Sequence, residues 1–453
     1  MSDMGFCSSC VVVFGNTQQL YYKSQGSCKV VKMQTTPRLA MLGVSQAFHA
    51  KRRCHMNSTI LPACFQLPTD VPFAFSLQAL AVHLQTVPDR RKRRGRRYPR
   101  PPLLTLAVVA KLAGHSRLEA LADWAKLRAA DLAQLFGLTR TTMPHQSTWS
   151  RILGQAVDPV ALEQALTTFF QDPPTGDAPP RGSLILVVDG KTLRGTIPLG
   201  HTQGVHLVAA YLPEQGVVLA QLEVDTKANE IVVVPTLLAQ LDLQGRVVVG
   251  DAMQTQRAVS VQIVEAGGDY LWFVKENQPT LLGEIEALFA PPPITAGHAA
   301  PVRDFTTARQ VEKGHGRLEE RVLTASAMLV GYSDWPYLAQ VFKLERTVWQ
   351  QGRQLLSEVR YGLTSLPRTV ADAERLLVIA RAEWGIENGL HYRRDVTLQE
   401  DAGQLRRGGG PQVMAALNNV VVSLLGQHRE RNLAAVQRRF AYQFDRFLAQ
   451  LSM

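Results

Sequence analysis

The sequence predicts an α/β protein in which an all-α domain precedes a sheet-containing core. Between Phe75 and Phe170 the apolar residues recur at helical spacing. A Pro/Gly-rich stretch at 172–182 follows, of the kind that separates domains. Directly after it, apolar strands alternate with helical segments, which is the pattern of an α/β sheet.

The core is predicted to run in the order strand, hairpin, helix, strand, helix, strand. The apolar strand that opens it ends at Asp189, and a second buried strand ends at Asp251. After Pro291 the sequence changes to alternating segments typical of strands, which predicts a β-rich insertion, and helical spacing returns at Ala371. The expected core segments are strand 183–189, hairpin strands 205–212 and 217–224, helix 229–241, strand 246–251, helix 256–266 and strand 270–274.

Changes in composition and in the spacing of apolar residues divide the chain into six parts. The first has no sustained period and a different composition, so we expect a poorly ordered extension or a mis-called start. The parts are an extension at 1–70, a helical basic domain at 71–171, a linker at 172–182, the first part of the core at 183–290, the β-rich insertion at 291–370, and the helical remainder with the C-terminal tail at 371–453.

Positive charge is concentrated in two places. The formal net charge is +11, and residues 90–100 hold eight Lys or Arg and no acid. Residues 404–453 hold seven Lys or Arg and two acids. Clustered cations suit a polyanion, because neutralising phosphates releases counterions. The alternative is a solvated basic surface.

The cysteines and the apolar runs exclude several classes of protein. All five cysteines lie in the first 64 residues, which excludes a disulfide-stapled enzyme. Cys7 and Cys10 have the spacing of half a zinc site, but no second close pair completes it. The sequence has no apolar run of membrane-spanning length and no continuous apolar core of a signal peptide, so we expect a cytoplasmic protein that does not bind membranes.

Within the helical domain, the stretch 143–153 offers Ser147 as the N-cap of a helix that carries Trp149 and Ile152. This helix is compatible with a helix-turn-helix. A plain helical bundle explains the pattern equally well.

Two carboxylates stand where a sheet binds ligands. Asp189 and Asp251 each follow an apolar strand, and the carboxyl ends of neighbouring strands meet at one edge. Oxygen donors without a nearby His or Cys suit Mg²⁺ or Mn²⁺.

A third carboxylate lies on the helical stretch near residue 387. Glu387, His391 and Arg394 follow one another at helical spacing, so that one side of a helix could meet metal and phosphate together. The alternative is an exposed helix pair without a metal.

Seven ordered strings resemble the H-repeat-associated branch of bacterial insertion-sequence DDE transposases. They lie at 187–195, 205–211, 227–231, 247–256, 267–281, 315–321 and 384–401. The basic run at 88–99 and the following stretch at 112–124 are similar to the helical domain associated with that family. The resemblance covers about 74–430 and implies a ribonuclease-H-like core.

By this resemblance, Asp189, Asp251 and Glu387 are the catalytic carboxylates and the ligands of two Mg²⁺ or Mn²⁺ ions. The sequence departs from the family beside the third carboxylate, where Glu383 replaces a usual His. Arg393 and Arg394 stand where relatives are apolar. Glu383 and Asp395 therefore remain rivals for the third ligand.

Several further residues are predicted to contact DNA phosphates near the cut or along the basic run. They are Lys191, Arg194, Lys275, Asn277, Gln278, His315, Arg317, His391, Arg394, Arg91, Lys92, Arg93, Arg94, Arg96 and Arg97.

The resemblance implies a transposase that binds the terminal inverted repeats of its element and target DNA, and that cleaves and joins strands with two metal ions. It is expected to act as a homodimer on paired ends and to lie with the nucleoid when bound. Two alternatives remain: a nuclease of the same fold without strand transfer, and a DNA-binding remnant that has lost catalysis.

Overall fold

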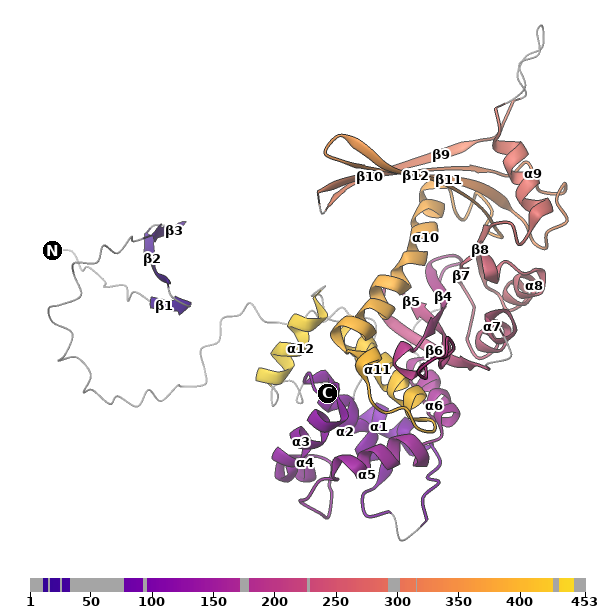
Figure 1. Cartoon of the computed structure of the whole chain (residues 1–453). Coiled ribbons are helices and arrows are strands. Elements are labelled where there is room, and N and C mark those ends of the chain that lie inside the picture. The colour runs from indigo at the N-terminus through magenta and orange to yellow at the C-terminus, as the bar shows by residue number, and fades with distance from the viewer. Residues whose placement is uncertain are drawn as a thin grey trace, which may run out of the picture. The chain divides into compact units, whose positions relative to one another are not determined.

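The computed structural model describes residues 11–14, 17–24, 27–32, 77–92, 96–171, 179–225, 229–291, 302–314, 316–426 and 432–443. The chain divides into two compact units, Met1–Thr69 and Asp70–Met453 (Figure 1). Within the first unit, the described residues form a three-stranded antiparallel sheet of β1 (Val11–Phe14), β2 (Thr17–Ser24) and β3 (Ser27–Lys32). The sequence had predicted no strand here.

The second unit begins with helices only, as predicted. In the described residues they are α1 (Leu77–Gln85), α2 (Arg100–Leu112), α3 (Leu118–Leu127), α4 (Ala129–Leu135), α5 (Gln146–Arg151), the π-helix η3 (Ile152–Ala156) and α6 (Pro159–Gln171). Helix α5 begins at Gln146, and His145 is its N-cap through a bond from the Ser147 amide to its Nδ1. The prediction of Ser147 as the cap was wrong by two residues.

The core strands form one mixed sheet. Its central part contains β4 (Leu184–Thr192), β5 (His206–Leu212), β6 (Val217–Val224), β7 (Arg246–Gly250) and β8 (Asp269–Val274). Their spatial order is β6-β5-β4-β7-β8, with the β4, β5 and β6 pairs antiparallel and the β4–β7 and β7–β8 pairs parallel. Short helices η4 (Arg194–Thr196) and η5 (Ala252–Gln254) follow β4 and β7. The core is ribonuclease-H-like, as the family resemblance implied.

The insertion extends this sheet instead of forming a separate one. After α9 (Pro279–Phe289), which was not predicted, come β9 (Thr306–Gly314), β10 (Arg317–Ser326), β11 (Gln340–Gln350) and β12 (Arg353–Thr364). β12 pairs with β8, so the nine strands are continuous in the order β6-β5-β4-β7-β8-β12-β11-β10-β9. These four strands lie within the range predicted to be β-rich.

Helices cover the sheet on both faces (Figure 1). α7 (Glu230–Leu238) packs on β5 and β6 and α8 (Arg257–Glu265) on β8, whereas α10 (Ala373–Ile386) crosses the other face over β4 and β7 and reaches β9 and β10. The chain then forms π-helices η6 (Glu387–His391) and η7 (Arg393–Thr397), the short η8 (Glu400–Ala402), α11 (Gly410–Gly426) and α12 (Leu433–Tyr442).

The helical domain and the sheet share one hydrophobic core. Helix α11 contacts α2, α6 and β6, and α6 also packs on β6. Leu104 of α2, Val187 of β4 and Val420 of α11 belong to the same cluster of buried side chains. The helical domain is therefore packed against the sheet-containing core. No helix among the described residues has the length and apolarity needed to cross a membrane.

Candidate active site

The register of the sheet sets Asp189 and Asp251 at one level. β4 and β7 are parallel neighbours, and Val188 lies opposite Gly250. Asp189 and Asp251 are the next residues of the two strands, and adjacent strands lie about 4.8 Å apart. β4 does not end at Asp189, as had been predicted, but continues to Thr192, because its other edge still pairs with β5. Asp189 is thus held by strand backbone, and its side chain is 37% exposed.

Glu387 and His391 reach Asp189 from the other side of the site. Ligand atoms of Asp189, Glu387 and His391 lie within 4.8 Å of one another. Nε2 of His391 is 3.1 Å from Oδ2 of Asp189, and the His391 side chain is 5% exposed. Glu387 itself is exposed. The three side chains form a compact donor set of two carboxylates and one imidazole.

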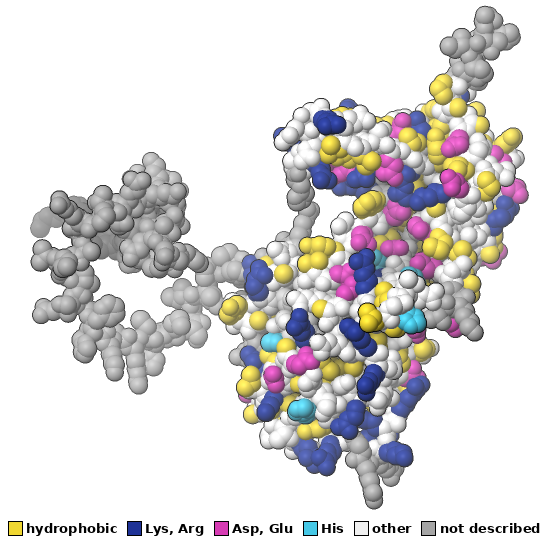
Figure 2. Space-filling model, in the orientation of Figure 1, with side chains coloured by type: hydrophobic (Ala, Val, Ile, Leu, Met, Phe, Trp, Pro, Cys, Tyr) yellow, Lys and Arg dark blue, Asp and Glu magenta, His cyan; other side chains and the backbone are white. Residues whose placement is uncertain are grey.

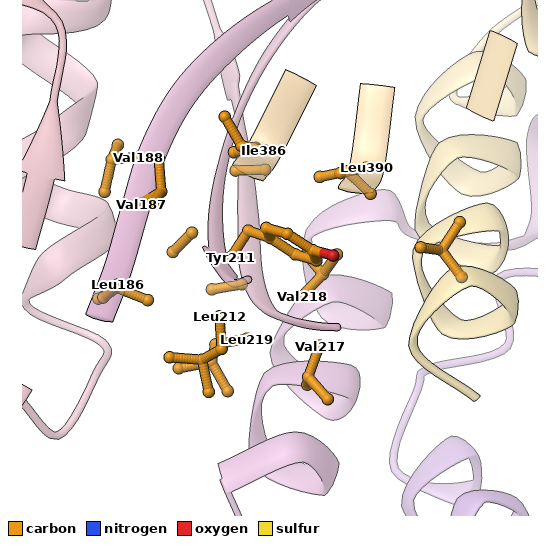
Figure 3. Close-up of a cluster of buried hydrophobic side chains, with 14 of the residues drawn as sticks. Leu186, Val187, Val188, Tyr211, Leu212, Val217, Val218, Leu219, Ile386 and Leu390 are labelled. Atoms are coloured by element: carbon orange, nitrogen blue, oxygen red, sulfur yellow. The ribbon is translucent and has the colours of Figure 1, made fainter. Parts of the chain in front are cut away.

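Small residues allow the helical segment to approach the sheet this closely. An added Cβ at Gly389 would overlap the hydroxyl of Tyr211 on β5, and one at Gly385 would lie 2.7 Å from Cβ of Pro213. Ile386 and Leu390 are buried beside Tyr211 in the apolar cluster under the site (Figure 3). Apolar packing on both sides of Glu387 therefore fixes its height above β4.

The segment that carries Glu387 is π-helical. Glu387–His391 and Arg393–Thr397 form two successive π-turns, a rare geometry that recurs at functional sites. A π-turn holds more residues than the 3.6 of an α-turn. The regular helical spacing had predicted that Arg394 lies on the same side as Glu387. Because the segment is π-helical, it does not.

Asp251 lies beside this group but turns toward its own loop. Its Oδ1 accepts a hydrogen bond of 2.9 Å from the Met253 amide at the start of η5. Burial raises the pKa of Asp251 above its ordinary value, and the negative charges of Glu230 and Asp189 raise it further, against the lowering effect of the Met253 bond. Asp251 thus belongs to the acidic centre electrostatically, although its carboxylate is outside the compact donor set.

Sequence reasoning missed Glu230 and His206, which lie close to Asp251 on the α7 side. Nε2 of His206 is 2.8 Å from Oε1 of Glu230, and the Gln254 amide donates to Oε2 of Glu230 at 3.0 Å. A Cβ at Gly190 would overlap this carboxylate. The available signal was the position of Glu230 inside the string 227–231, one of the family motifs.

Both rivals for the third ligand are engaged by cations. The guanidinium of Arg360 donates to both oxygens of Glu383, at 2.6 and 2.9 Å. Lys191 Nζ lies 2.6 Å from Oδ2 of Asp395. Of the three candidates on this segment, Glu387 is the one grouped with Asp189.

Several predicted DNA contacts are buried or engaged within the protein. Arg394 has no exposed side-chain surface and pairs with Glu400, so its predicted contact with a phosphate is wrong. His391 faces Asp189 and is buried, so it does not form part of an outer DNA surface either. Lys191 is 9% exposed and paired with Asp395.

In the basic run at 88–99, some cations form bonds within the protein and others are exposed without such bonds being described. Arg91 is 12% exposed and holds both Asp89 and the carbonyl of Tyr98, and Arg96 donates to backbone carbonyls of the same loop. Lys92 and Arg97 are exposed. Arg93, Arg94 and, in the insertion, His315 lie outside the described residues.

The remaining predicted contacts lie in the core and in the insertion. Arg194, Lys275, Asn277 and Arg317 are exposed. The Asn277 and Gln278 amides donate to the carbonyls of Ala252 and Thr255, and so tie the loop after β8 to the loop after Asp251. In Figure 2, acidic side chains gather in the middle of the molecule's face, with Lys and Arg side chains above and below them. This distribution suits a polyanion that crosses a cation-binding centre.

Comparison with known proteins identifies the family. Residues 180–421 match the transposase DDE domain family, and residues 81–170 match the family described as DDE_Tnp_1-associated. "H repeat-associated putative transposase YhhI" of Escherichia coli (strain K12) is 26% identical over 385 residues, which cover 80% of this chain and 97% of that protein. "Putative transposase YncI" of Escherichia coli O157:H7 is 28% identical over 361 residues, which cover 77% and 88% of the two chains.

Among solved structures, a piggyBac transposase synaptic complex with hairpin DNA is similar over 85% of this chain and 79% of that chain. Its TM-score is 0.37 and its identity 10%, a likeness too low to support an argument. The family match spans more than half of the sequence, including Asp189, Asp251 and Glu387. The chain belongs to the family of DDE-domain transposases.

Proposed function

We propose that this protein is an insertion-sequence transposase that binds the ends of its element and carries out metal-dependent DNA cleavage and strand transfer. The observation that carries the proposal is the meeting of Asp189, Glu387 and His391 within 4.8 Å, next to Asp251 on the neighbouring strand. Its partner is double-stranded DNA, with a homodimer holding two ends in the cytoplasm or on the nucleoid.

The three carboxylates Asp189, Glu387 and Asp251 suit divalent cations of the magnesium type. Carboxylate oxygens are the ligands that Mg²⁺ and Mn²⁺ prefer, and a cation would offset the like charges that raise the pKa of Asp251. Asp189, Glu387 and Asp251 would hold these ions. When bound, the ions supply activation of a water or 3′-hydroxyl and neutralise charge at the leaving oxygen.

The protein side chains hold and orient these parts. His391 fixes the carboxylate of Asp189, and the loop tied by Asn277 and Gln278 supports the turn that carries Asp251. Exposed cations at Arg194 and Lys275 would contact phosphates near the cut, and exposed Arg317 would contact DNA at the tip of the β9–β10 hairpin. Fixed positions of this kind are what in-line displacement at phosphorus requires.

A gel assay with DNA that includes both flanks of the gene tests the proposal. Wild-type protein with Mg²⁺ or Mn²⁺ should cut at the element ends and join them to target DNA. Asp189→Asn, Asp251→Asn and Glu387→Gln should bind this DNA but cut it at least a hundredfold more slowly.

Glu383→Gln and Asp395→Asn are the matched controls, because they change carboxylates of the same segment that are paired with cations. They should retain metal-dependent cutting. Cutting without joining would show a nuclease, and binding by the wild type without cutting under any divalent ion would show a remnant.

A further inference from the structure

A buried polar network surrounds Arg394, which the proposed chemistry does not use. Its guanidinium has no exposed surface, and its Nε donates to both oxygens of Glu400, at 3.0 and 2.9 Å. Its Nη1 donates to Oε1 of Gln221 on β6 at 2.9 Å and to Oδ1 of Asn419 on α11 at 3.2 Å. Arg394 thus joins the π-helical segment to the sheet and to α11.

Two routes lead from Arg394 into the helical domain. In the first, Glu400 accepts from the Asn418 amide at 2.8 Å, and Oδ1 of Asn418 accepts from Lys111 Nζ on α2 at 2.8 Å. In the second, the Gln221 amide donates to Oε1 of Glu163 on α6 at 2.8 Å. The described hydrogen bonds are continuous from α2 and α6 to the segment that carries Glu387.

A network of this kind is not needed for stability alone. Taking charges out of water is costly, and well-packed apolar side chains in the same place are often as stable or more so. Buried polar groups do, however, specify one arrangement through the hydrogen bonds that they form. Nε and Nη1 of Arg394 form such bonds, whereas its buried Nη2 has no partner among the described residues. The segment from Glu387 to Thr397 consists of two π-turns and so lacks the regular frame of an α-helix.

We propose that Arg394 is a positioning residue, which through this network holds Glu387 at cation-binding distance from Asp189. The helical domain of residues 77–171 is then a fixed part of the catalytic centre. This inference rests on the proposed function, because it assigns Arg394 an effect on the cation site and not on DNA.

Binding of Mn²⁺ to the full chain without DNA tests the inference, measured by electron paramagnetic resonance of the free ion. Arg394→Lys keeps the charge but loses the planar fork. It should raise the half-saturating Mn²⁺ concentration about tenfold, the lower end of the effect of outer-shell partners. Arg181→Lys is the matched control, since Arg181 forms a similar two-bond pair with Asp269, and it should leave Mn²⁺ binding unchanged.

A charge-balanced variant separates positioning from stability. The double variant Arg394→Met with Glu400→Gln removes both charges and should unfold at nearly the wild-type temperature. If Arg394 is a positioning residue, this variant should nevertheless bind Mn²⁺ more weakly than the wild type. Wild-type Mn²⁺ affinity in the double variant or in folded Arg394→Lys would overturn the inference.

If Asp189→Asn also binds Mn²⁺ as the wild type does, the cation site itself is misplaced, and the proposed function fails. That failure is therefore distinguishable from a failure of the role of Arg394.

Discussion

Nε2 of His391 lies 3.1 Å from Oδ2 of Asp189, across 202 residues of chain. Nδ1 of His391 is buried and has no hydrogen-bond partner among the described residues. A proton on Nδ1 would be a buried donor without an acceptor, whereas a proton on Nε2 points at a carboxylate. His391 is therefore best satisfied as a donor to Asp189, which leaves the remaining lone pairs of that carboxylate for a cation.

This relationship predicts the order of effects of two substitutions. His391→Ala removes the donor and should raise the half-saturating Mn²⁺ concentration by about tenfold, as loss of an outer-shell partner does. His391→Gln places an amide N–H near the position of Nε2 and should recover most of the affinity. Mn²⁺ titrations of both variants measure the difference, and equal affinities in the two would refute the donor role.

A second prediction concerns the close approach of the helix to the sheet at Gly389. Gly389→Ala would set a methyl group against the hydroxyl of Tyr211 and should push Glu387 away from Asp189. We expect weaker Mn²⁺ binding and a loss of about 1–3 kcal/mol in the free energy of unfolding, as in other overpacked cores. Denaturant unfolding and Mn²⁺ titration check the two effects.

Two variants give this prediction its controls. Tyr211→Phe removes the nearest atom and should partly restore Gly389→Ala. Gly283→Ala, in a helix where nothing lies within 4 Å of the added Cβ, should be neutral or stabilise by up to about 1 kcal/mol. An equal loss of stability at both glycines would contradict the steric account.

We expect the titration of Lys111 to contribute to the pH dependence of the free energy of unfolding. Burial lowers the pKa of Lys111 from 10.5 to about 8, although the charge of Glu400 raises it. Between these values the unfolded chain binds the proton and the folded chain does not, so stability rises with pH through this window. The slope contributed by one group is at most about 1.4 kcal/mol per pH unit.

Lys111→Met has no proton to lose and should lack this contribution. The difference in free energy of unfolding between wild type and Lys111→Met, measured from pH 7.5 to 10.5, isolates it from other lysines and tyrosines. A difference that stays constant across this range would show that Lys111 titrates normally in the folded protein.

The basic run offers a test of which cations meet DNA. Exposed Arg97 and Lys92 should each contribute to counterion release, so Arg97→Gln or Lys92→Gln should reduce the slope of log affinity against log salt by about 0.9. Arg91 is engaged by Asp89 and Tyr98, and Arg91→Gln should lower thermal stability with the slope unchanged. Binding titrations over a series of salt concentrations decide between them, and identical slopes in all three variants would count against the assignment.

Much of the fold could be predicted because each core strand is a nearly continuous apolar run. Strands β4, β5, β6, β7 and β8 fall where the sequence predicted them, and the strand order agrees with the family resemblance. The strands of the insertion were predicted only as a β-rich range, and β9 among them is largely exposed and carries little apolar alternation. Helix α9 was not predicted, although it buries Leu281, Ile285 and Phe289 at helical spacing within the range given to the core.

The carboxylates of the candidate site could be predicted from the sequence, but the contacts of the residues around them could not. Asp189 and Asp251 follow apolar strands, a local signal, and Glu387 came from the family motif. The burial of Arg394 and the pairing of Lys191 with Asp395 depend on two π-turns and on contacts between distant segments. The spacing of residues on a regular α-helix does not predict these positions. Each π-turn adds a residue to the turn and so rotates every later side chain about the helix axis.

The order of segments along the chain also determines when the centre can form during synthesis. A polypeptide still on the ribosome at residue 386 has its basic run and its first two carboxylates, but it lacks both Glu387 and α11, against which α2 and α6 pack. Neither the interior of the helical domain nor the acidic centre is complete at that stage. Under the proposed function, a nascent chain could therefore not cut the DNA from which its own message is being copied until Glu387 and α11 have been synthesised.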